Sequence, residues 1–173
     1  MSTEETRSVW PRTLVLVRHG AAHGHSPKGD HARPLTETGR EDARRVGRWL
    51  AAQGLRADAI LFSTALRARQ TAQELARGGL EVGQSWEERR IYNAHVDEIE
   101  ACIRDVPDEV TTLVVVGHTP GVPGLVAGSH DPEGLAGSLG GWPTTGVGIL
   151  GLSGPWSSFP DDSTLLALHH PFD

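Results

Sequence analysis

The segment LVLVRHGAA, residues 14–22, is the feature that most limits how this chain can fold. The aliphatic run Leu14 to Val17 is typical of a buried strand, and that strand must turn where Arg18, His19 and Gly20 follow it. Ligands of α/β folds gather at the ends of strands, and an arginine beside a histidine pairs a permanent cation with a nitrogen nucleophile. A structural Arg-His pair that satisfies loop carbonyls is the alternative.

Short apolar runs and helical patterns alternate along the rest of the chain. The predicted strands are Leu14 to Val17, Ala59 to Phe62, Leu113 to Val116, Val147 to Leu152 and Leu165 to Leu168. The predicted helices are Glu37 to Ala52, with Thr36 as its N-cap and Gly54 just past its end, then Ala65 to Arg77, Val96 to Asp105 and Pro120 to Ala127. This order favours an α/β fold, a single domain whose mostly parallel sheet has helices on both faces and a crevice at the carboxyl ends of its strands.

Composition narrows the class of protein. The 173 residues, 38% of them hydrophobic, suit one globular domain, which we expect over residues 13–173 after a flexible N-terminus of residues 1–12. The formal charge of −6 argues against nucleic acid as a partner. Neither a secretory signal nor an apolar run long enough to span a membrane is visible, so we expect a cytoplasmic protein with no membrane partner. The single cysteine, Cys102, is expected to be a small core residue.

A second motif, STALRARQTA, follows the strand that ends at Phe62. Ser63 or Thr64 can cap the next helix, whose first turns then hold Arg67 and Arg69. A cation near a helix N-terminus costs about 0.3–1 kcal/mol unless an anion is shared between them. We interpret Arg69 as solvent-facing, whereas Arg67 either binds an anion or points to solvent.

Other arginines and one glycine-rich stretch have simpler interpretations. Arginines 40, 44 and 48 recur every four residues and predict a solvated helix face. Residues 128–145 predict a long surface loop that borders the site.

The third motif is Gly117-His118-Thr119-Pro120-Gly121, after the strand that ends at Val116. Thr119 suits an N-cap and Pro120 the first helical position, which places His118 between a strand end and a helix start. Three strand ends thus each deliver a residue suited to phosphate, a coincidence that packing alone would rarely produce.

With these motifs the chain resembles the histidine phosphatase superfamily, through RHG at residues 18–20, the arginine of LRARQTA and the histidine of GHTPG. It is most similar to the short phosphohistidine phosphatases of the SixA-like branch, through ARPLTETGREDARRVGRWL at 32–50, STALRARQTA, IYNA at 91–94, VVVGHTPG and PTTGVGIL at 143–150. The match runs from about residue 13 to 152 in the order of the family. The resemblance implies a phosphoglycerate mutase-like fold.

The resemblance also implies a role for each matched residue. His19 is the nucleophile that forms a phosphohistidine intermediate, while Arg18, Arg67 and His118 hold the phosphoryl oxygens, without a metal or cofactor. Phosphoryl transfer needs mainly alignment and positive charge around those oxygens. Attack requires a neutral His19 whose other ring nitrogen donates to a carbonyl or similar acceptor. Arg33, in ARPLT, is either a secondary phosphate-binding residue or an ordinary loop arginine.

The sequence departs from larger relatives at the residue that donates a proton to the leaving group. Many larger relatives carry a glutamate general acid in the middle of the chain, where this sequence has Asn93, which cannot serve as an acid. Glu87 and Glu88 are the nearby carboxylates, and each is also readily explained as a solvated charge. The missing acid favours a phosphohistidine substrate, because a leaving imidazole is readily protonated near neutral pH.

We therefore expect a metal-independent phosphatase whose partner is a phosphorylated protein carrying phosphohistidine. The alternatives are a phosphatase for a small phosphorylated metabolite and a catalytically silent phosphohistidine-binding protein. A metal site is a further rival, because four histidines fall within one short stretch, although familiar ligand spacings are missing. These histidines are His19, His23, His25 and His31.

Overall fold

Six strands form one sheet in the part of the chain that the structure, a computed structural model, describes, residues 10–138 and 141–171. The strands are β1 (Arg12–Arg18), β2 (Ala57–Ser63), β3 (Val82–Glu88), β4 (Thr112–Gly117), β5 (Val147–Leu152) and β6 (Ser163–His169). The helices are α2 (Glu37–Ala52), α3 (Leu66–Arg77), α4 (Val96–Arg104) and α5 (Gly121–Ala127), with short 3-10 turns at η1 (Asp30–Ala32), η2 (Arg89–Ile91), η3 (Ala136–Ser138) and η4 (Trp156–Ser158).

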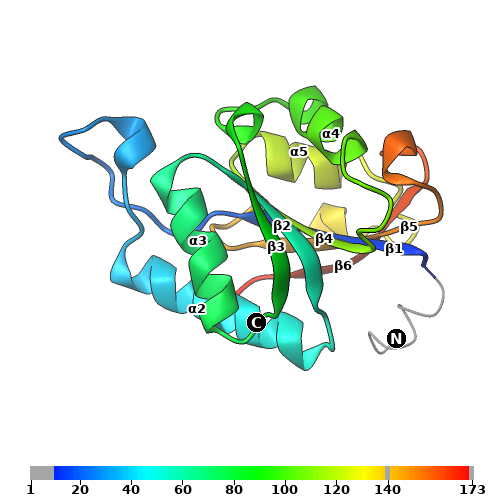
Figure 1. Ribbon diagram of the computed structural model, residues 1–173, viewed down its shortest axis with the longest axis horizontal. Helices are drawn as coiled ribbons and strands as arrows, with labels where there is room; N and C mark the ends of the chain where they lie inside the picture. Colours follow the sequence, from blue (N-terminus) through cyan, green and yellow to red (C-terminus); the bar gives the residue numbers. More distant parts are fainter. Residues whose placement is uncertain (1–9, 139–140, 172–173) are drawn as a thin grey trace.

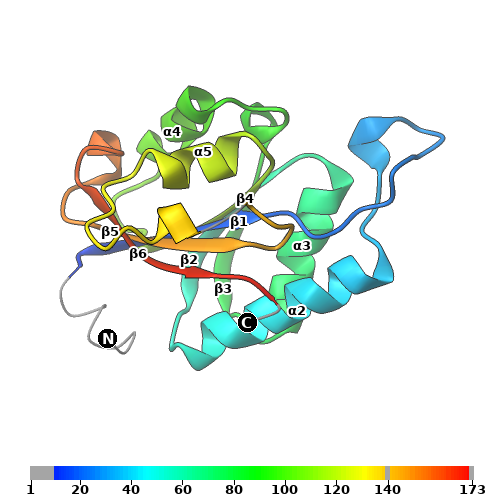
Figure 2. The same cartoon turned by 180° about the vertical axis from the view of Figure 1, so that it is seen from behind.

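The sheet has the strand order β3-β2-β4-β1-β5-β6. The first four strands in this order run parallel, whereas β5 is antiparallel to β1 and β6 is antiparallel to β5. Helices α2 and α3 cover one face of the sheet and α4 and α5 cover the other (Figures 1 and 2). The predicted mostly parallel sheet with helices on both faces is therefore confirmed.

The two faces of the sheet carry separate apolar cores, and alternate residues of β1 contribute to each. Leu14 and Leu16 point into the core under α4 and α5, and Val15 and Val17 point into the core under α2 and α3. All four side chains are fully buried, as expected for a central strand covered on both sides. Cys102 lies in the first of these cores, as predicted.

Strand β3 is the element that the sequence patterns missed. Its sequence, VGQSWEE, is mostly polar, and none of its residues is buried. It is an edge strand that pairs with β2, and its main chain holds it in the sheet while the partly buried side chains of Trp86 and Val82 each pack against one of the two cores. Hydrophobic periodicity gives no signal for such a strand.

The ends of the helices test the predicted caps. Thr36 caps α2, since its hydroxyl accepts from the Gly39 N–H, and Gly54 follows the helix with a φ of 76°. The predicted cap of α3 by Ser63 or Thr64 is wrong, because Ala65 occupies the N-cap and both hydroxyls have other partners.

The predicted start of α5 is also displaced by one residue. Pro120 is the N-cap and makes no side-chain capping bond, so Thr119 is not the cap and the helix begins at Gly121. The position after β4 is nevertheless the expected one, with His118 between a strand end and a helix start.

Helices α2 and α3 are joined through the buried carboxylate of Glu74. This side chain is fully buried and accepts from Arg40, Arg44 and Arg77. The expectation that Arg40 and Arg44 are simply solvated is therefore wrong, because periodicity along α2 cannot show a carboxylate presented by α3. Arg48, which is exposed, fits that expectation.

The two segments expected to be irregular flank the sheet. Residues 1–9 of the N-terminus lie outside the described residues, and β1 begins at Arg12. The segment 128–145, apart from its undescribed residues 139 and 140, contains η3 and lies beside the end of β1, where the Thr145 N–H donates to the carbonyl oxygens of Arg18 and His19. No helix within residues 10–138 and 141–171 is long and apolar enough to cross a bilayer.

Candidate active site

The carboxyl ends of β1, β2 and β4 meet at one edge of the sheet because these strands are parallel neighbours. The residues that follow them line one cavity of about 380 Å³. Its lining includes the five residues that the sequence analysis proposed for attack on phosphorus or for phosphate binding: Arg18, His19, Arg33, Arg67 and His118. The rest of its lining is Ala22, Asp30, Asn93, Thr119 and Thr144.

His19 is held as a neutral imidazole with a defined tautomer. Its Nδ1 lies 2.7 Å from the Gly20 carbonyl oxygen, which can only accept, so Nδ1 carries the proton and Nε2 the lone pair. Burial is the largest effect on the pKa of His19, and together with the neighbouring arginines it lowers this pKa to about 4 against the opposing effect of the Gly20 contact. Near neutral pH this ring meets the requirement for a nucleophile stated above.

The two arginines nearest His19 are fixed through their terminal nitrogens. Arg18 donates from NH1 to the Trp142 carbonyl oxygen at 2.7 Å. Arg67, of which 4% is exposed, donates from NH1 to the Asp30 carbonyl oxygen at 2.9 Å and from NH2 to the Asp30 carboxylate at 3.2 Å. In both residues Nε is buried and has no hydrogen-bond partner among the described residues.

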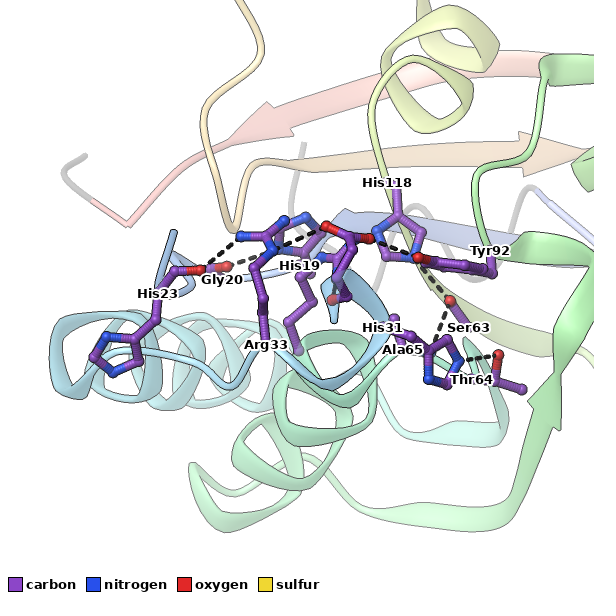
Figure 3. A network of polar contacts seen from close by, with 12 residues as sticks. His19, Gly20, His23, His31, Arg33, Ser63, Thr64, Ala65, Tyr92 and His118 are labelled. Carbon is purple, nitrogen blue, oxygen red and sulfur yellow. Dashed lines mark hydrogen bonds and ion pairs between the residues drawn. The ribbon is translucent and has the colours of Figure 1, made fainter. Parts of the chain in front are cut away.

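His118, like Arg18 and Arg67, has one buried nitrogen without a hydrogen-bond partner among the described residues. Its ring centroid lies 5.1 Å from that of His19, and Figure 3 shows it between His19 and Tyr92. Nε2 lies 2.7 Å from the Ser63 hydroxyl, whereas Nδ1 is buried without a partner in the described part of the chain. Burial lowers the pKa of His118 to about 3, so this ring is also neutral.

Arg18, Arg67 and His118 thus line one cavity, and each has a buried nitrogen, Nε in the arginines and Nδ1 in the histidine, without a partner among the described residues. A buried polar atom left without a partner is costly unless a ligand satisfies it. Two permanent cations and a neutral imidazole suit the oxygens of a phosphoryl group.

Arg33 also lines this cavity. It donates from Nε to the Asp30 carboxylate at 2.9 Å and from NH1 to the His23 carbonyl oxygen at 2.7 Å (Figure 3). Arg33 is therefore part of the cavity lining, held there by Asp30 and His23.

Sequence reasoning missed Asp30 and Tyr92. The Tyr92 hydroxyl donates to the Asp30 carboxylate at 2.6 Å, and this bond, with contributions from Arg33 and Arg67, holds the pKa of Asp30 well below its usual range. The Tyr92 ring packs edge-on against His118. No local pattern identifies this cluster, since 62 residues separate its two members.

The two glutamates considered as proton donors lie outside the cavity lining. Glu87 pairs with Arg69, which is exposed as expected, and Glu88 pairs with Arg90. Neither carboxylate lines the cavity. Asn93 does line it, with a φ of 54°, but an amide cannot supply a proton as an acid. Within the described residues no group of three His, Cys, Asp or Glu side chains is arranged to hold a metal ion, so the four histidines between 19 and 31 do not converge.

The chain is similar to known proteins in sequence and in fold. Residues 14–118 match the histidine phosphatase superfamily (branch 1). A solved structure assigned to SixA from Nakamurella multipartitia superposes with a TM-score of 0.78, at 32% identity over 94% of this chain and 97% of that one.

Two curated relatives extend the comparison. The Mycobacterium tuberculosis (strain H37Rv) protein Rv1276c is 34% identical over 161 residues, which cover 90% of this chain and 99% of that protein. Phosphohistidine phosphatase SixA of Escherichia coli K12 is 31% identical over 117 residues, which cover 66% of this chain and 71% of that enzyme.

The chain belongs to the histidine phosphatase superfamily, with the single-domain α/β fold of the phosphoglycerate mutase-like type. This membership supports phosphatase activity. Within the superfamily the chain belongs to the SixA-like branch, as its motifs indicated.

Proposed function

We propose that this protein is a metal-independent phosphatase that removes the phosphoryl group from phosphohistidine in proteins, through a covalent intermediate on His19. The observation that carries the proposal is the neutral His19, with Nδ1 bonded to the Gly20 carbonyl oxygen, in one cavity with three residues that each have a buried nitrogen without a partner in the described part of the chain. The phosphohistidine phosphatase among the relatives supports the choice of substrate.

The first chemical step transfers the phosphoryl group to the enzyme. The lone pair on His19 Nε2 attacks phosphorus, the bond from phosphorus to the substrate nitrogen breaks, and its electron pair leaves with the substrate imidazole. Arg18 and Arg67 donate from Nε to the equatorial oxygens, and His118 contributes Nδ1. Positive charge for the transition state comes from the two arginines.

The second step regenerates the enzyme. A water oxygen attacks phosphorus, the bond to His19 Nε2 breaks, and its electron pair returns to that nitrogen. The proton lost by water ends on the departing phosphate or in solvent. The contact between Nδ1 and the Gly20 carbonyl oxygen keeps the ring in the same tautomer throughout.

A phosphohistidine substrate also fits the acid chemistry of the cavity. Asp30 is the carboxyl group in its lining, and its depressed pKa keeps it ionised near neutral pH. An alcohol leaving group needs a proton donor, whereas an imidazole titrates near neutrality and needs less help. A phosphatase for a small metabolite is the second candidate, since the cavity would also accept a compact phosphomonoester.

The test is phosphate release from a phosphohistidine peptide, together with mass spectrometry of the protein, in excess chelator. We expect release and a trapped phosphoryl group on His19 in the wild type, and neither in His19→Ala. His25→Ala, which removes an exposed histidine from the loop after β1, serves as the matched control and retains both signals.

Other outcomes would redirect the assignment. Turnover of a small phosphomonoester with the peptide untouched would favour the metabolite phosphatase. No turnover of either substrate would favour a phosphohistidine-binding protein. Activity that is lost only in chelator would contradict metal independence.

A further inference from the structure

Asp30 places an ionised carboxylate at the mouth of the cavity. One oxygen accepts from Tyr92 at 2.6 Å and from Arg67 at 3.2 Å, and the other accepts from Arg33 at 2.9 Å. The side chain is 52% exposed, so it is reached from solvent as well as from the cavity that it lines with His19.

Asp30 cannot take the part of the general acid that larger relatives use, because its carboxyl group is ionised. The hydrogen bond from Tyr92 comes first among the causes that hold its pKa far below neutrality, so Asp30 has no proton to give. It remains an acceptor, because an ionised carboxylate has about four acceptor positions and only three are used by Tyr92, Arg67 and Arg33.

A phosphorylated imidazole offers the complementary donor. When its distal ring nitrogen carries a proton, the electron pair of the breaking bond goes to the leaving nitrogen and the ring departs as neutral imidazole. No proton has to move during that step. Without the distal proton the ring would depart as an anion, which is a far poorer leaving group.

We propose that the Asp30 carboxylate accepts a hydrogen bond from the distal ring nitrogen of the substrate phosphohistidine and so stabilises the protonated, more reactive form of the substrate. Asp30 then replaces the missing acid by holding a proton that the substrate brings itself. The proposal rests on the proposed function and adds to it a residue that selects a nitrogen leaving group over an oxygen one.

The charges around Asp30 are consistent with this role. Arg33 and Arg67 face it from the loop after β1 and from α3, Tyr92 faces it from the turn after η2, and His31, its neighbour in η1, packs edge-on against Tyr92. His19 and His118 are neutral. A bound phosphoryl group offsets the charge of the arginines, which leaves Asp30 to balance a cationic ring.

The experiment compares two substrates that differ in the leaving group. Phosphoimidazole has the distal nitrogen, whereas p-nitrophenyl phosphate releases a stable phenolate that needs no proton. For each enzyme the readout is the ratio of kcat/KM on phosphoimidazole to kcat/KM on p-nitrophenyl phosphate. Any loss that Asp30→Asn causes through Arg33 or Arg67 affects both substrates and divides out of this ratio.

In Asp30→Asn we expect the ratio to fall about 10- to 100-fold, the range for losing a hydrogen bond to a charged group. Activity of the wild type on phosphoimidazole should also persist to higher pH than that of the variant, because the carboxylate raises the pKa of the bound ring. Asp161→Asn removes an exposed carboxylate in the turn before β6 and should keep the wild-type ratio.

A second variant distinguishes loss of the carboxylate from a general disturbance of the residues around Asp30. Tyr92→Phe removes one donor from Asp30 but keeps the carboxylate, so the ratio should not fall. An unchanged ratio in Asp30→Asn, or an equal fall in Tyr92→Phe, overturns the role of Asp30 and leaves the phosphatase assignment standing. If the wild type cleaves p-nitrophenyl phosphate but not phosphoimidazole, both the substrate assignment and the role of Asp30 fail.

Discussion

The tautomer of His118 depends on Ser63, a residue that does not line the cavity. Ser63 is fully buried, and its hydroxyl oxygen accepts from the Ala65 N–H at 3.2 Å and contacts His118 Nε2 at 2.7 Å. These are the hydrogen-bond contacts of that hydroxyl among the described residues, so its proton is directed to Nε2. His118 Nδ1 then carries the ring proton and can donate to a phosphoryl oxygen.

We predict that Ser63→Ala lowers kcat/KM about five- to ten-fold, the effect of roughly one hydrogen bond on the orientation of His118. The ¹⁵N shifts of the His118 ring should also change from a protonated Nδ1 to a mixture of tautomers. Ser85→Ala, in the exposed strand β3, is the control. A drop in activity with an unaltered tautomer would show that Ser63 acts through packing alone.

The loop that carries His19 packs against the first turn of α2, and this contact between elements positions the loop. The Thr36 N–H donates to the Ala21 carbonyl oxygen at 2.9 Å, while Thr36 caps the helix. A Cβ at Gly39 would lie only 2.1 Å from the same carbonyl oxygen. The glycine therefore allows the backbone after β1 to lie directly on α2, two residues from the proposed nucleophile.

Gly39→Ala should push this loop away and so reduce both stability and kcat, with a loss of about 1–3 kcal/mol in the free energy of unfolding from overpacking. The matched control is Gly24→Ala, since a Cβ at Gly24 meets no atom within 4 Å. Urea unfolding and phosphate release measure the two effects. Equal behaviour of the two variants would mean that the loop yields without moving His19.

The stability of the whole fold is coupled to pH through the buried histidines of the site. Burial lowers the pKa of His19 to about 4 and that of His118 to about 3, whereas the unfolded chain titrates near 6.5. Below about pH 6.5 the unfolded state therefore binds more protons than the folded state, and stability falls as the pH drops toward the folded values.

We predict a cost on the order of 1–2 kcal/mol for each of these histidines at about pH 5 relative to neutral pH. The free energy of unfolding should fall less between these two pH values in His19→Ala than in the wild type, and the difference cancels the titration of unrelated carboxylates. His25→Ala should behave as the wild type. An identical fall in all three proteins would contradict a strongly depressed pKa for His19.

The parts of the fold that sequence patterns predicted are those encoded locally. The central strands, the bounds of α2 and its Thr36 cap follow from hydrophobic periodicity and capping chemistry, which need only neighbouring residues. Parallel strands then bring their carboxyl ends to one edge, so the convergence of His19, Arg67 and His118 was predictable as well.

Other features depend on contacts between distant segments, and only the folded chain decides them. The edge strand β3 exists because β2 offers its main chain, and Glu74 is buried because three arginines surround it. The depressed pKa of His19 comes from burial, which no local pattern measures. Asp30 contacts Tyr92 and Arg67 only because η1 packs against the start of α3. The position of the residue that we propose to bind the leaving group therefore depends on tertiary packing.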